Sequence, residues 1–149
     1  MPDLAALTQL SISGLRRSIV PALKARYRGA GVGLVIEGAK QDTWLVANLN
    51  NPFRDWVDDD ARGGAAACKA YASAVRAIDK LPQDRDRRAD EAEAVLQSLV
   101  EALNGIEQKY EIIDTLRREE ACDAFMELAA RAEVPSHLAD QWLDEWRDF

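Results

Sequence analysis

The sequence has few of the residues that build metal centres and catalytic triads, because it contains only one histidine and two cysteines. Any triad or Cys-His pair would have to use His137, which follows a predicted helix start and is expected on a solvent-facing first turn. A structural zinc site takes four His or Cys ligands, one more than the chain has. Cys68 and Cys122 lack CxxC spacing, so we interpret them as buried thiols in a reducing compartment and leave a disulfide between them open.

The short motifs that bind nucleotides or activate a serine are also missing. The chain has no phosphate loop ending in Lys-Ser or Lys-Thr, no GxGxxG and no GxSxG. The glycines of residues 29–33 precede a predicted strand, whereas a dinucleotide loop joins a strand to a helix. A calcium loop beginning at Asp58 fails because Arg62 and Lys69 stand where ligands belong. We therefore assign no catalytic residue, no metal and no cofactor.

Long apolar runs are absent as well. No stretch of about 18 apolar residues is available to span a bilayer. The first residues lack the basic segment and the apolar run of a signal peptide. We expect a cytoplasmic protein without a membrane partner.

Charge is distributed unevenly along the chain. Residues 1–57 carry seven Lys or Arg and four Asp or Glu, a balance of +3, whereas residues 58–149 carry twelve and twenty-two, a balance of −10. The net charge of −7 argues against nucleic acid as the partner, because neutralising phosphates takes clustered Lys and Arg. The basic residues near the N-terminus either pair with the acidic helices or form a small patch for an acidic partner or RNA.

The first third of the chain predicts helices followed by two strands. Residues 3–10 are expected to form a short helix. Ser13 is expected to cap a second helix, which Pro21 either kinks or restarts as a first-turn residue. Residues 32–36 alternate in polarity and residues 43–49 are β-rich, so the two predict an antiparallel hairpin. A lone hairpin is marginal in water, so we expect it to pack on helices.

From Asp60 onward the pattern is helical throughout. We predict helices over 64–80, from Asp84 or Asp86, from Asp114 or Thr115, and from Pro135–Ser136. The third of these is expected to bury one face made of Leu116, Ala121, Phe125, Leu128 and Ala132.

Residues 96–113 carry a seam with alternating spacings of three and four, typical of coiled coils. Its members are Leu96, Leu99, Leu103, Ile106, Tyr110 and Ile113. Asn104–Gly105 lies within the seam and can break the helix there. The seam either packs inside the protein or pairs with a second copy.

These patterns predict one domain over residues 1–149, with subregions 1–57 and 58–149. The expected fold is α+β and predominantly helical. An N-terminal helix and a small antiparallel sheet would pack on a C-terminal bundle of about four helices.

The acidic remainder and the tryptophans suggest a function in binding. We expect a non-enzymatic protein of the inhibitor, immunity or chaperone type that binds a basic protein through an acidic helical surface. Tryptophan is over-represented at binding hot spots and is also a large core residue. The expected partner-binding residues are Trp56, Asp58, Asp59, Asp60, Trp142, Asp144, Glu145 and Trp146.

Two alternatives stay open. The first is a self-assembling module that uses the seam of residues 96–113. The second is an enzyme or small-ligand protein in which Asp55 and Asp58 line a pocket for a metal or a cationic substrate.

Overall fold

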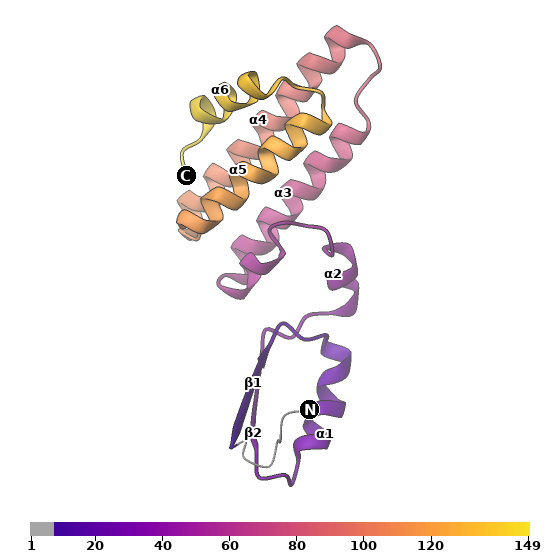
Figure 1. Cartoon of the computed structure of the whole chain (residues 1–149), viewed down its shortest axis with the longest axis vertical. Coiled ribbons are helices and arrows are strands. Elements are labelled where there is room, and N and C mark those ends of the chain that lie inside the picture. The colour runs from indigo at the N-terminus through magenta and orange to yellow at the C-terminus, as the bar shows by residue number, and fades with distance from the viewer. Residues whose placement is uncertain (1–7) are drawn as a thin grey trace. The chain divides into compact units, whose positions relative to one another are not determined.

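The computed structural model describes residues 8–149 (Figure 1). The chain is mostly helical with one two-stranded sheet among the described residues, which confirms the α+β, predominantly helical fold. It divides into two compact units, Met1–Leu49 and Asn50–Phe149, which we treat separately. That division falls eight residues before the predicted boundary at residue 57, and a single domain stays a prediction.

The first unit is built on a strand–helix–strand arrangement. Strands β1 (Gln9–Ser13) and β2 (Gly33–Glu37) pair in parallel, from Gln9 with Gly33 to Ser13 with Glu37. Between them lie the short 3-10 helix η2 (Arg17–Ile19) and α1 (Val20–Tyr27), because parallel neighbours need a crossover connection. Helix α2 (Asp42–Ala47) follows β2.

The predicted antiparallel hairpin is therefore wrong. The β-rich residues 43–49 are largely helical in α2, and β2 pairs instead with β1. Residues 3–7 of the predicted first helix lie outside the described residues, and Ser13 ends a strand instead of capping a helix. The alternation of Leu10 and Ile12 with polar neighbours gives β1 one half-buried face. Pro21 occupies the first turn of α1, as one of its two predicted roles requires.

The second unit begins with the short 3-10 helix η3 (Arg54–Asp58) and continues with four α-helices. These are α3 (Ala61–Asp79), α4 (Arg85–Tyr110), α5 (Thr115–Arg131) and α6 (Ser136–Trp146). Figure 1 shows α3, α4 and α5 running side by side, with α6 lying along α4 and α5.

Aspartate side chains begin three of these helices. Asp60, Asp84 and Asp114 each accept a hydrogen bond from the backbone N–H three residues later. The predicted starts at Asp84 and Asp114 are thereby confirmed. Asn104–Gly105 does not break the chain, because α4 continues through it.

The core of the second unit contains the predicted seam. Leu96, Leu99, Leu103 and Ile106 are buried against α3, α5 and α6. On α5, Ala121, Phe125, Leu128 and Ala132 are buried as expected, but Leu116 is 63% exposed, so its predicted place in the core is wrong. Pairing of the seam with a second copy would require those four α4 residues to leave this core.

Two glycines at the start of α3 allow close contacts, Gly64 with η3 and Gly63 with Ile112 of the α4–α5 connection. A Cβ on Gly64 would lie 2.3 Å from the backbone nitrogen of Val57 and 2.6 Å from the carbonyl carbon of Trp56. A Cβ on Gly63 would lie 2.8 Å from Cδ1 of Ile112. Gly64 therefore allows a backbone-to-backbone contact with η3 that no larger residue permits, and Gly63 leaves room for the side chain of Ile112.

Candidate partner-binding surface

The structure places the eight predicted binding residues on two different sets of elements. Trp56, Asp58, Asp59 and Asp60 belong to η3 and the start of α3, and η3 packs on α3. Trp142, Asp144, Glu145 and Trp146 lie on α6, which packs on α5 and α4.

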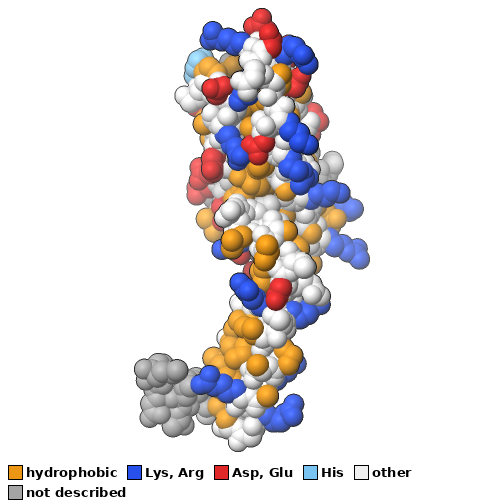
Figure 2. Space-filling view, turned by 90° about the vertical axis from the view of Figure 1, so that its right-hand side faces the viewer, with side chains coloured by type: hydrophobic (Ala, Val, Ile, Leu, Met, Phe, Trp, Pro, Cys, Tyr) orange, Lys and Arg blue, Asp and Glu red, His pale blue; other side chains and the backbone are white. Residues whose placement is uncertain are grey.

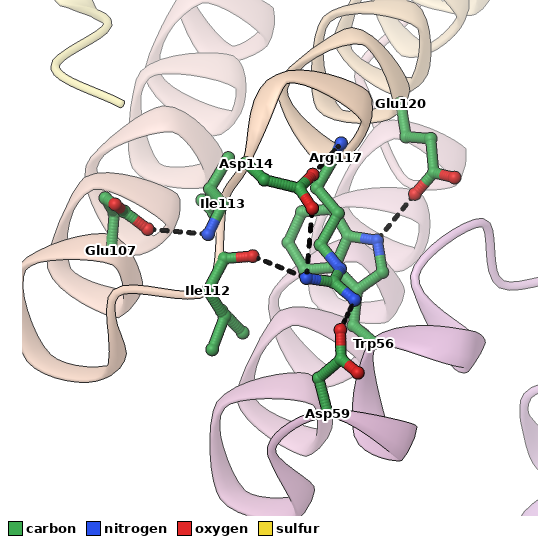
Figure 3. Close-up of polar contacts among 8 residues, drawn as sticks. All are labelled: Trp56, Asp59, Glu107, Ile112, Ile113, Asp114, Arg117 and Glu120. Atoms are coloured by element: carbon green, nitrogen blue, oxygen red, sulfur yellow. Dashed lines mark hydrogen bonds and ion pairs between the residues drawn. The ribbon is translucent and has the colours of Figure 1, made fainter.

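Trp56 belongs to the core and not to the surface. Its ring is 1% exposed and lies 4.4 Å from the ring of Phe53. Its indole Nε1 donates a 2.6 Å hydrogen bond to a carboxylate oxygen of Glu120 on α5 (Figure 3). This contact satisfies the one polar group of a buried indole, so Trp56 joins η3 to α5.

The neighbouring aspartates also have structural contacts. Asp60 caps α3, and the carboxylate of Asp59 forms an ion pair with the guanidinium of Arg117. Arg117 donates a further 2.8 Å hydrogen bond to the carbonyl oxygen of Ile112 and lies 3.7 Å from Asp114 (Figure 3). Because Arg117 is only 18% exposed, this cluster holds the α4–α5 connection against η3.

A carboxylate of α4 stabilises the same connection. Glu107 accepts a 2.7 Å hydrogen bond from the backbone N–H of Ile113 (Figure 3). Sequence reasoning did not find Arg117, Glu107 or Glu120, because each acts on a group from another element. No local pattern marks such contacts in advance.

The α6 group consists of a stacked tryptophan pair and two exposed carboxylates on the same helix. The rings of Trp142 and Trp146 stack at 5.2 Å with an angle of 16° between their planes, and both side chains are half-buried. The ring of Trp146 also meets the ring of Phe125 edge-on at 6.5 Å. Asp144 is 79% exposed and Glu145 is exposed. The stack is therefore anchored on one side and open to solvent on the other.

The arginine nearest to these carboxylates is already engaged. Arg147 lies 3.6 Å from Asp144 and donates a 3.4 Å hydrogen bond to the sulfur of Cys122. An exposed pair of this kind contributes about 0–1 kcal/mol, so Asp144 remains available to an incoming cation.

A hollow of about 380 Å³ lies beside the C-terminal segment. Its lining includes the carboxylates of Glu101, Glu107 and Asp148 and contains no Lys or Arg. Asn104 fixes this segment to α4, because its amide donates to the carbonyl of Trp146 and accepts from the N–H of Asp148, both at 2.8 Å. The hollow can receive a positively charged side chain. Within residues 8–149, no group of three His, Cys, Asp or Glu residues is arranged to hold a metal ion.

A second cavity, of about 440 Å³, borders Trp142 on the side of the α5–α6 turn. It carries charge of both signs, since Arg85 and Arg88 lie opposite Glu133, and Arg88 pairs with Glu133 at 2.9 Å. With Arg88 paired to Glu133, Arg85 leaves this cavity with one excess positive charge, which does not suit a basic partner.

The described residues also include one tyrosine with a perturbed pKa. Burial raises the pKa of Tyr71 above the usual 10.0, the Glu127 carboxylate raises it further, and Arg131 partly opposes the shift. Tyr71 lies 5.7 Å from the ring of Phe53, on α3 and away from α6. His137 is exposed, and no disulfide joins the buried Cys68 to the half-buried Cys122.

Comparisons with protein-family models, with curated proteins and with solved structures found no match to this chain. Among the helices of residues 8–149, none has the length and apolar character to cross a membrane.

Proposed function

We propose that this is a cytoplasmic, non-enzymatic protein that binds a basic protein through α6 and the adjoining hollow. We call this region the acidic α6 surface, made of Trp142, Asp144, Glu145 and Trp146 together with the hollow at Asp148. The observation that carries the proposal is the half-buried tryptophan stack on a helix with two exposed carboxylates, together with the hollow lined by three more carboxylates, which Asn104 joins to the backbone of Trp146.

The chemistry of this surface suits a partner rich in Lys and Arg. A stacked, anchored indole pair offers a large contact area at little entropic cost, and a guanidinium can lie over its face. The surrounding carboxylates raise the association rate with a basic protein and disfavour acidic ones. An inhibitor, immunity protein or chaperone would use such a surface. Asp59 and Asp60 are left out of the proposal, because both already hold the fold together.

The experiment captures partners from a lysate of the source organism at low salt and at about 0.5 M salt, where surface charges are screened. It compares the wild-type protein with the variant Asp144→Asn/Glu145→Gln. A matched control, Glu119→Gln/Asp123→Asn, makes the same charge change on exposed residues of α5. All three proteins are first shown to melt alike.

We expect one basic protein to be retained by the wild type and by the control at low salt and released at high salt. Its affinity for the α6 variant should fall about tenfold, as expected for two charges at an interface rim. Equal retention by all three proteins, or retention of no basic protein, would contradict the proposal.

A further inference from the structure

A groove between α3 and α4 forms a separate surface of the second unit, Asn50–Phe149, which we call the helical unit. It has a volume of about 400 Å³ and is almost entirely apolar. Its walls are small side chains, chiefly Ala70, Ser73 and Ala77 from α3 and Ala94, Ser98 and Ala102 from α4. Small residues let another helix approach closely, at the lower end of the usual 8–10 Å between helix axes.

The α3 edge of this groove is basic. Arg62, Lys69 and Arg76 are seven residues apart in turn, so they form one exposed row along α3, which Lys80 continues. None of the four forms an ion pair within residues 8–149. The acidic residue of this helix, Asp79, belongs to another face, because it pairs with Arg131 of α5 at 2.5 Å.

The α4 edge of the groove is acidic. Residues 89–108 of α4 contain five Asp or Glu and no Lys or Arg. Asp90 and Glu101 are exposed and share the helix row of Ala94, at the groove's outer border. Arg87, on the same row, pairs with Glu91 at 3.5 Å. Figure 2 shows Lys and Arg side chains gathered along one side of the helical unit, with apolar side chains beside them.

We propose that a second copy of this chain covers the groove, with α3 of each copy lying over α4 of the other. Opposite charges on the two edges make the face self-complementary under a two-fold axis that runs along the groove. The perpendicular two-fold axis would place α3 over α3 and bring the basic rows together. Charge therefore selects the first arrangement, which is an isologous dimer.

The position of each residue along the groove axis predicts which charged residues of the two copies form ion pairs. The lining extends from Ala70 to Ala77 on α3 and from Ala94 to Ala102 on α4. Because the two helices run antiparallel (Figure 1), we place Ala70 opposite Ala102 and Ala77 opposite Ala94 along the groove. A rotation about an axis along the groove keeps each residue at its level. Lys69 of one copy then faces Glu101 of the other, and Lys80 faces Asp90.

The groove can be buried without leaving a serine unsatisfied. The hydroxyl of Ser98 donates a 2.8 Å hydrogen bond to the carbonyl of Ala94, and Ser73 accepts one from Arg76. The face is also large enough, because the 19 residues of α3 extend about 28 Å. With two helices across, it approaches the roughly 800 Å² per partner of a stable interface.

The test uses the full chain and measures its mass by sedimentation over a hundredfold range of concentration. We compare the wild type with Lys80→Glu, with Asp90→Lys and with the two combined. These residues lie outside the acidic α6 surface, so the test is independent of the proposed function. Lys24→Glu, an exposed site on α1, is the matched control for charge.

We expect a wild-type dimer whose dissociation constant rises at least tenfold in each single variant, because each reversal creates two like-charge pairs per dimer. The combined variant should recover to within about threefold, since it restores both pairs with their signs exchanged. If a single variant melts early, the neutral variants Lys80→Gln and Asp90→Asn replace the pair; each should weaken the dimer, and the two combined should weaken it no further. A monomeric wild type, a dimer unaffected by single reversals, or a combined variant as weak as the single ones would overturn the proposal.

Discussion

Replacing Gly64 by alanine should destabilise the helical unit, although alanine favours helices. Gly64 lies in the second turn of α3, where its backbone touches η3. The new Cβ would lie 2.3 Å from the nitrogen and 2.5 Å from Cα of Val57, whereas an ordinary contact needs about 3.5–4.0 Å. Both contacting atoms are backbone, so no side-chain rotation relieves them. Helix η3 would have to move by about 1 Å, and Trp56 would move with it.

The magnitude follows from two opposing terms. Alanine gains about 1 kcal/mol over glycine in helix propensity. Overpacking costs about 1–3 kcal/mol or more, and this contact belongs at the upper end because it displaces a backbone segment and a buried indole. We therefore expect the free energy of unfolding to fall by about 2–3 kcal/mol. For a unit of this size, the melting temperature should drop by about 10–20 °C.

Gly105→Ala is the matched control. Gly105 also lies inside a helix, but a Cβ there would meet nothing within 4 Å. It should raise the free energy of unfolding by about 0.5–1 kcal/mol, which is the propensity term alone. Both variants are compared with the wild type by urea and thermal unfolding followed by circular dichroism. A Gly64→Ala protein as stable as Gly105→Ala would refute the close contact between η3 and α3.

Three further predictions concern single contacts. Glu120→Ala removes the acceptor of the buried Trp56 indole and should lower the free energy of unfolding by about 1–3 kcal/mol in urea titrations. Glu120→Gln keeps an acceptor oxygen and should therefore retain most of the wild-type stability. Because burial raises the pKa of Tyr71, the folded protein favours the neutral phenol. The stability that depends on the neutral phenol is fully present below pH 10.0 and is lost as pH rises through the raised pKa. Glu127→Gln should lower that pKa in a spectrophotometric titration, and no change would remove the carboxylate as a cause. Asn104→Ala should release the C-terminal segment at a cost of about 1–2 kcal/mol, and unchanged amide exchange of that segment would contradict this role.

The helical unit was predictable because its signals are local. Capping aspartates indicate where α4 and α5 begin, because each accepts a hydrogen bond from the backbone N–H three residues later. Apolar residues at helical spacing indicate which faces of these helices are buried. The predicted burial of Leu116 was wrong because this residue lies in the first turn of α5, where its side chain is exposed to solvent. The sheet failed because its pairing is non-local. The local β-propensity of residues 43–49 counted for less than the pairing of β2 with β1 across a crossover helix.

The candidate site divides in the same way. Trp142 and Trp146 stack because they are four residues apart on one helix. The α6 part of the candidate site was therefore predictable from the sequence. The burial of Trp56 depends on Gly64 and on Glu120 of another helix, and nothing near residue 56 indicates it. The acidic hollow depends on Asn104, which binds a segment more than forty residues away along the chain. Contacts across such distances are set by packing and not by local pattern.

Charge is also distributed unevenly within the helical unit. Residues 61–80, which form α3 and its end, carry four Lys or Arg and one Asp, whereas residues 85–146 carry seven Lys or Arg and sixteen Asp or Glu. A uniformly acidic bundle would repel a second copy at every face. A basic helix beside acidic ones instead leaves one face able to pair with itself and the α6 side strongly negative. The two proposed surfaces can coexist on one protein, because the tryptophan stack lies on α6 and the basic row lies on α3, and Glu101 of α4 borders both surfaces.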